Sequence, residues 1–169
     1  MKRKNFFLIA IIAVLVVAVA ILASMNKEIA KEKDETSLLI KMGSQQVVIS
    51  FEELLRYQPS TFIANVKSSG KDPVPTEFTG VLLSTILQDK GFNLSGSEQV
   101  TFKAIDGYQT NVLGSEVLED ENIYVVYKRE GEFTKSRAQG GSGPMEIVIA
   151  KDPFSQRWNK FLVEIVIAP

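Results

Sequence analysis

The sequence contains no cysteine and no histidine among its 169 residues. Without cysteine there is no disulfide, no thiolate nucleophile, no iron–sulfur ligation and no structural zinc site of the usual kind. Without histidine there is no Ser-His-Asp relay, no imidazole metal ligand and no near-neutral imidazole base. Any catalysis would depend on Asp, Glu, Lys, Tyr or Ser side chains or on a bound cofactor, and oxygen-ligated metals such as calcium or magnesium stay open.

An excess of basic charge is also missing. The formal net charge is -1, and three of the positive charges belong to Lys2, Arg3 and Lys4 at the start of the chain. From Lys27 onward there are 16 basic and 20 acidic residues. Because the phosphates of nucleic acid demand a basic face, this balance argues against a nucleic-acid partner.

A long apolar segment follows the basic N-terminus. Residues 6–23 form an unbroken apolar run of 18, which is at the lower edge of the length that spans a membrane. Positive charge before the run predicts a cytoplasmic N-terminus and translocation of everything after it. We therefore expect a cytoplasmic tail over 1–5, a single-pass anchor in the cell membrane over 6–24, and an extracytoplasmic remainder.

A cleaved signal peptide is the alternative interpretation of this segment. Ala18-Val19-Ala20 supplies small residues at a suitable spacing for cleavage. The apolar run is longer than the usual signal core of about 7–15 residues, which favours an uncleaved anchor. A lipoprotein anchor is excluded because there is no cysteine, and residues 25–36, which are highly charged, are interpreted as a stalk.

Residues 37–169 are enough for one domain with one core. Ser50 and Glu53 form an S-x-x-E capping box that predicts a short helix ending before Pro59. Further helices are expected over 81–90 and 116–121, and a polar loop over 128–143. Alternating or continuous apolar runs predict strands over 38–42, 46–49, 61–66, 100–105, 123–127, 145–150 and 161–167. This pattern predicts a β-rich α+β domain.

Four segments, taken in order, resemble the molybdopterin-binding domain of the sulfite oxidase family and of its small exported bacterial relatives. They are F-T-G-V-L-L at 78–83 with Ile86, Leu87 and Gly91 following, A-I-D-G-Y at 104–108, G-P-M-E-I-V-I at 143–149, and S-Q-R-W at 155–158. The match covers about residues 60–167, nearly the whole domain. The resemblance implies a β-rich mixed domain of this type and a molybdopterin cofactor.

The departures from the family pattern concern the chemistry. The cysteine that ligates molybdenum in the family would come from the region 61–67, where this chain has none. The arginine of the third motif is Glu146, whose charge would repel an anionic ligand. The lysine of the fourth motif is Arg157, whose planar fork still suits a phosphate. The resemblance therefore implies the fold more strongly than the redox chemistry.

Six residues are candidates for binding a cofactor or anion. Arg157 is carried over from the fourth motif. Trp158, the single tryptophan, would stack on a pterin or instead anchor the core. Asp106 and Tyr108 would border a cleft, or simply form a tight turn. Arg129 and Arg137 belong to a basic loop beside Gly140-Gly141-Ser142-Gly143, which suits either an anion or solvent.

Two functions remain open at this point, together with a purely structural role in the cell envelope. The first is a non-catalytic binding or accessory module whose partners are the membrane, through 6–24, and a small anionic ligand or a membrane protein. The second is an oxidoreductase that holds molybdopterin without a protein thiolate, the cofactor supplying the chemistry. No catalytic residue is assigned. No metal ligand is assigned either, because the acidic cluster over 116–121 lacks the spacing of a calcium loop.

Overall fold

A computed structural model describes residues 15–17, 35–67 and 70–169. The chain divides into two units, 1–34 and 35–169, and only the second is described as a domain. Leu15, Val16 and Val17 are helical and exposed, and the rest of the predicted tail and anchor and most of the stalk lie outside the described residues. Within the described ranges, no helix has the length and apolar character needed to cross a membrane.

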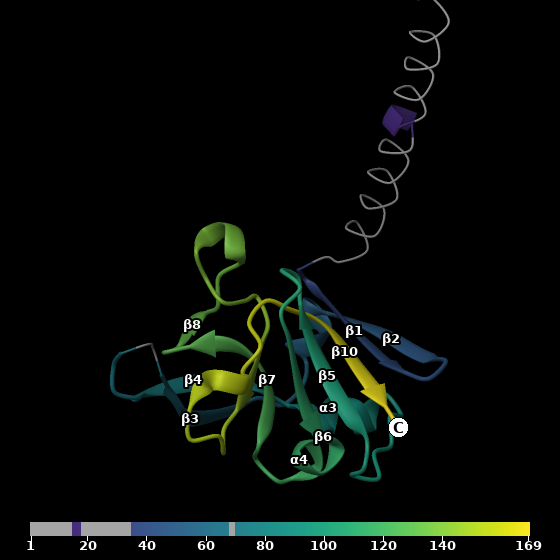
Figure 1. Ribbon diagram of the computed structural model, residues 1–169. Helices are drawn as coiled ribbons and strands as arrows, with labels where there is room; N and C mark the ends of the chain where they lie inside the picture. The colour runs from purple at the N-terminus through teal and green to yellow at the C-terminus, as the bar shows by residue number, and fades with distance from the viewer. Residues whose placement is uncertain (1–14, 18–34, 68–69) are drawn as a thin grey trace, which may run out of the picture. The chain divides into compact units, whose positions relative to one another are not determined.

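Two β-sheets make up most of the domain (Figure 1). The first has the order β2 (Gln45–Ser50), β1 (Ser37–Met42), β10 (Leu162–Ala168), β5 (Gln99–Ala104) and β6 (Gln109–Leu113). The second has the order β3 (Ser60–Val66), β4 (Val74–Leu82), β7 (Ile123–Arg129) and β8 (Glu132–Phe133), and β9 (Glu146–Ile149) also pairs with β7. The predicted β-rich α+β class is confirmed.

Helices are short and few in the described part of the domain. They are α2 (Phe51–Leu54), α3 (Leu83–Asp89), α4 (Gly114–Leu118) and the 3-10 turns η1 (Arg137–Gln139) and η2 (Ser155–Arg157). The predicted cap of α2 is present, because the Ser50 side chain accepts a hydrogen bond of 3.1 Å from the Glu53 N–H.

The helix predicted over 81–90 begins two residues later than expected. Val81 and Leu82 belong to β4 and pair with Val125 and Tyr124 of β7. Their neighbour Gly80 allows this close pairing, since a Cβ there would lie 2.5 Å from the Val125 carbonyl oxygen. Strand pairing has therefore overridden the helical spacing of these apolar residues.

Two other expectations also need correction. The acidic helix expected over 116–121 is α4, which begins at Gly114 and ends at Leu118, because Glu119 already has an extended backbone. The loop expected over 128–143 instead contains the end of β7, the short strand β8 and the turn η1.

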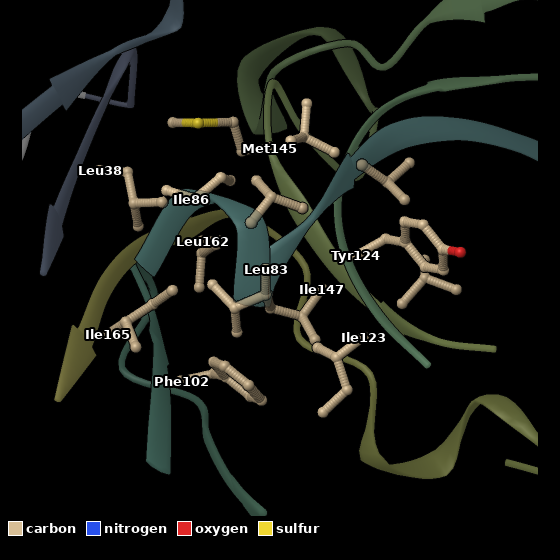
Figure 2. Close-up of a cluster of buried hydrophobic side chains, with 14 of the residues drawn as sticks. Leu38, Leu83, Ile86, Phe102, Ile123, Tyr124, Met145, Ile147, Leu162 and Ile165 are labelled. Carbon is tan, nitrogen blue, oxygen red and sulfur yellow. The ribbon is translucent and has the colours of Figure 1, made fainter. Parts of the chain in front are cut away.

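The core lies between the two sheets, with α3 inside it. Figure 2 shows Leu83 and Ile86 of α3 among side chains from both sheets. Leu38, Phe102 and Ile165 come from the first sheet, and all three are fully buried. The remaining labelled side chains are Ile123, Tyr124, Met145, Ile147 and Leu162.

The segment between β9 and β10 passes from the second sheet to the first. Asn159 forms two backbone hydrogen bonds with Ile147 of β9, at 2.8 and 3.2 Å. The Asn159 side chain, fully buried, donates a hydrogen bond of 3.2 Å to the Phe102 carbonyl of β5. This arrangement fixes residues 155–161 between the two sheets, where they contribute to a cavity.

Candidate functional site

A cavity of about 320 Å³ opens where six segments of the domain meet. Its walls come from the end of β3, from β4, from the β5–β6 turn, from the end of β7 and β9, and from residues 155–161. The lining residues are Val66, Lys67, Phe78, Asp106, Tyr108, Arg129, Glu146, Ser155, Gln156, Trp158, Lys160 and Phe161. Small-molecule sites commonly have this combination of aromatic walls and a few polar groups.

The β5–β6 turn holds one side of the cavity. The Asp106 side chain accepts a hydrogen bond of 3.1 Å from the Tyr108 N–H, and Gly107 supplies the positive φ of 89° that the turn requires. The Tyr108 hydroxyl donates to the Gln156 carbonyl at 3.4 Å. The predicted turn is therefore present, and it places both side chains at the cavity.

Trp158 forms the aromatic wall. Its indole N–H donates to the Ile149 carbonyl at 3.2 Å, and its ring meets the Phe78 ring edge-on at a centroid distance of 5.4 Å. Only 7% of Trp158 is exposed. The residue is thus both a core anchor and part of the cavity lining, so the two interpretations of it from sequence are compatible.

Phe161 lines the cavity with an unusual backbone conformation. Its φ of 55° lies in the left-handed region, which a bulky side chain rarely adopts. Two backbone hydrogen bonds hold it there, from the Phe161 N–H to Ser142 at 2.8 Å and from the Ile105 N–H to the Phe161 carbonyl at 3.0 Å. Such strain is concentrated at functional sites in proteins.

Three cationic side chains border the opening. Lys67, Arg129 and Lys160 come from the end of β3, the end of β7 and the segment before β10, and all are exposed. The Lys67 ammonium lies 4.2 Å from the centre of the Phe154 ring, and the Arg129 guanidinium lies 5.7 Å from that of Phe78. These contacts hold the two charges beside aromatic surface.

Glu146 is the buried charged group of the cavity. It is 3% exposed, and its Oε1 atom has no hydrogen-bond partner among the described residues. Burial raises the pKa of Glu146 to about 7, while the Ser142 hydroxyl, Lys160 and Arg129 oppose that rise. Glu146 therefore changes its protonation state near neutral pH.

The structure brings four of the six predicted site residues together. Asp106, Tyr108, Arg129 and Trp158 all line the cavity. Arg137 is exposed on η1, outside that lining. Whether any of the six binds a ligand stays a prediction.

Arg157 also lies outside the cavity lining, because nearby carboxylates hold it. Its guanidinium donates to both Asp152 carboxylate oxygens and forms an ion pair of 2.8 Å with Glu116. The hydrogen bond to Asp152 and the one to Glu116 raise the pKa of Arg157. Its charge is thus balanced within the protein.

Several lining residues were not selected from the sequence. Lys160 is an isolated lysine with no motif around it, and tertiary folding alone brings it to the cavity. Lys67 follows β3 directly, in the region to which the resemblance assigned the missing cysteine. Glu146 was noticed only as a departure from the third motif.

The lining does not fit a molybdenum ion held by a protein thiolate. No cysteine exists in the chain, and Val66 and Lys67 line the cavity where the resemblance would place the metal ligand. An ammonium group at that place repels a metal cation. In the ranges that the structure describes, no group of three or more acidic side chains is arranged to hold a metal ion. The cations do suit an anionic group.

The raised pKa of Glu146 predicts a pH-dependent stability. Because the folded pKa of about 7 exceeds the unfolded value, the stabilising effect of the neutral form is complete at acid pH. This effect is lost as the pH rises through about 7, which lowers the free energy of unfolding by about 3 kcal/mol. We expect the wild type to lose stability relative to Glu146→Gln between pH about 5 and about 8.5, as measured by urea unfolding.

Glu52→Gln, an exposed carboxylate on α2, is the matched control and should follow the wild type. An equal pH dependence in Glu146→Gln and the wild type would contradict this assignment.

Comparison with known proteins supports the fold. No family model matches the chain, and no curated protein matches its sequence. Among solved structures, the sulfane dehydrogenase SoxCD from Paracoccus pantotrophus is similar, with a TM-score of 0.63 and 19% identity over 80% of this chain. The match covers 39% of the SoxCD chain. At this identity the likeness concerns the fold alone, which is β-rich in both proteins.

Proposed function

We propose that the domain is a non-catalytic binding or accessory module that holds a small anionic ligand in its cavity. The observation that carries the proposal is the convergence of Lys67, Arg129 and Lys160 on one aromatic-walled cavity, in a chain without the family's thiolate. A molybdopterin cofactor would find no thiolate for its metal in this chain, whereas the cations that attract an anion are present.

The chemistry of the walls limits the class of ligand. Arg129 offers the planar fork that matches a carboxylate, sulfonate or phosphate group, and the two lysines add positive charge. Trp158, Phe78 and Tyr108 provide aromatic surface for a flat, apolar part of the same molecule. A small aromatic or unsaturated oxyanion satisfies both features.

The second candidate is a molybdopterin-dependent oxidoreductase. The fold similarity to a sulfane dehydrogenase favours it, and the same cations would attract an anionic cofactor group. The place of Lys67 and the absence of cysteine count against it, so we rank it below the binding module.

Binding of a probe anion tests the first proposal. Benzenesulfonate combines a ring with a permanent negative charge, and benzylammonium is its cationic counterpart. We expect the fluorescence of Trp158 in the full-length protein to change on titration with the first and not the second. Arg129→Gln and Lys160→Gln should each weaken binding about tenfold, because each removes a charge-assisted contact.

Arg56→Gln removes an exposed arginine outside this cavity and should leave the affinity unchanged. Equal affinity for the two probes, or an affinity insensitive to Arg129 and Lys160, would refute the anion-binding function.

The membrane location is a separate part of the proposal. The apolar run over 6–24 would anchor the chain in the cell membrane with its N-terminus in the cytoplasm, and the domain would lie outside. The acidic balance after Lys27 suits an exported domain that has no nucleic-acid partner.

Fractionation of expressing bacteria checks this arrangement. We expect the protein to stay in the membrane pellet after an alkaline wash, at its full mass of 18.7 kDa, and to be digested by protease added to intact spheroplasts. Deletion of residues 6–24 should abolish both results. A soluble product that begins after Ala20 would show instead that the segment is a cleaved signal peptide.

A further inference from the structure

We infer that an anion enters this cavity together with a proton, which is taken up by the side chain of Glu146. The inference rests on the proposed function, because it specifies how the same cavity holds its ligand. It names Glu146 as a residue that selects the ligand, and it specifies the pH range in which the site binds an anion.

The position of Glu146 is the first support. Its backbone pairs with Val126 of β7, and its side chain lines the cavity although the residue is only 3% exposed. Its Oε1 atom lacks a hydrogen-bond partner within the described part of the chain. A buried polar atom without a partner is destabilising, so a bound group that forms a hydrogen bond with it is stabilised.

The charged surroundings of Glu146 are the second support. Arg129 lies at the end of β7 and Lys160 lies in the segment before β10. The positive charge of each opposes the rise in the pKa of Glu146, and both residues line the same cavity. The other polar groups that line this cavity are Lys67 at the end of β3, Asp106 and Tyr108 in the β5–β6 turn, and Ser155 and Gln156 of η2. The Ser142 hydroxyl, in the loop before β9, also acts on the Glu146 carboxyl.

These charges give the two forms of Glu146 opposite effects on an anion. The ionised carboxylate repels an entering anion and offsets the positive charge of Arg129 and Lys160. The neutral carboxylic acid donates its O–H to the anion and leaves both cations to the ligand. In the binding step, the Glu146 carboxylate takes up one proton as the anion enters. The product is a neutral carboxylic acid that donates a hydrogen bond to the anion.

A definite pH profile follows. The pKa of Glu146 is raised to about 7 by burial, and a bound anion would raise it further. Affinity should be highest below pH about 7 and should fall by up to tenfold for each pH unit above it, until the pKa of the bound form is reached.

Calorimetric titration of the full-length protein with benzenesulfonate measures both affinity and proton uptake. The sulfonate stays ionised throughout, unlike a phosphate group, whose second pKa is about 6. Titrations in two buffers of different ionisation enthalpy give the number of protons taken up. We expect roughly 20- to 30-fold weaker binding at pH about 8.5 than at about 6, with close to one proton bound per ligand at pH about 8.

Three variants separate Glu146 from other causes. Glu146→Gln presents an amide N–H donor at every pH, so its affinity should be independent of pH and without proton uptake. Glu146→Asp retains a carboxyl and should retain uptake, and the exposed Glu52→Gln should behave as the wild type. Equal wild-type affinity at both pH values without proton uptake would overturn the inference while leaving the anion-binding function intact.

The same inference would be overturned if Glu146→Gln kept the wild-type pH dependence. Failure of benzenesulfonate to bind at either pH would overturn the proposed function and, with it, the coupled proton.

Discussion

Asn159 joins the two sheets, and the cavity depends on that connection. Its backbone pairs with Ile147 of β9, and its buried side chain donates to the Phe102 carbonyl of β5. Residues on both sides of it, Trp158 and Lys160, line the cavity as a result. A buried amide with these partners is costly to lose, because the groups it satisfies would remain buried without hydrogen bonds.

The fold of this domain does not by itself determine its chemistry. The two-sheet architecture is similar to that of a sulfane dehydrogenase, yet at 19% identity only the fold carries over. The cavity of this chain is lined by Lys67, from the region in which the resemblance implies a thiolate, and by the buried Glu146, where the resemblance implies an arginine.

Local sequence signals predicted much of the fold. The strands β1 and β2, the cap at Ser50 and the turn at Asp106 each depend on residues that are neighbours in the chain, and each is present. The predicted start of α3 was wrong because Gly80 lets β4 lie close to β7. This is a long-range contact, which the helical spacing of apolar residues cannot reveal.

The candidate site was predicted only in part, for a similar reason. Arg157 belongs to the fourth motif, and its partner Asp152 is near it in the chain, but its other ion partner, Glu116, is distant. The motif alone therefore did not show that two carboxylates hold the guanidinium outside the cavity lining. Lys160 carries no local signal at all. Which charges face the cavity is determined by how six segments, distant in the chain, meet in the folded domain.

The proposed anion-binding module would work without molybdenum, and this separates it from a molybdopterin-dependent enzyme. The most direct measurement is the molybdenum and oxidised-pterin content of the full-length protein, expressed in a host that makes the cofactor and purified gently. For an anion-binding module we expect neither molybdenum nor pterin to accompany the protein in stoichiometric amount. Stoichiometric metal and pterin would contradict it and would require a ligand set other than a protein thiolate.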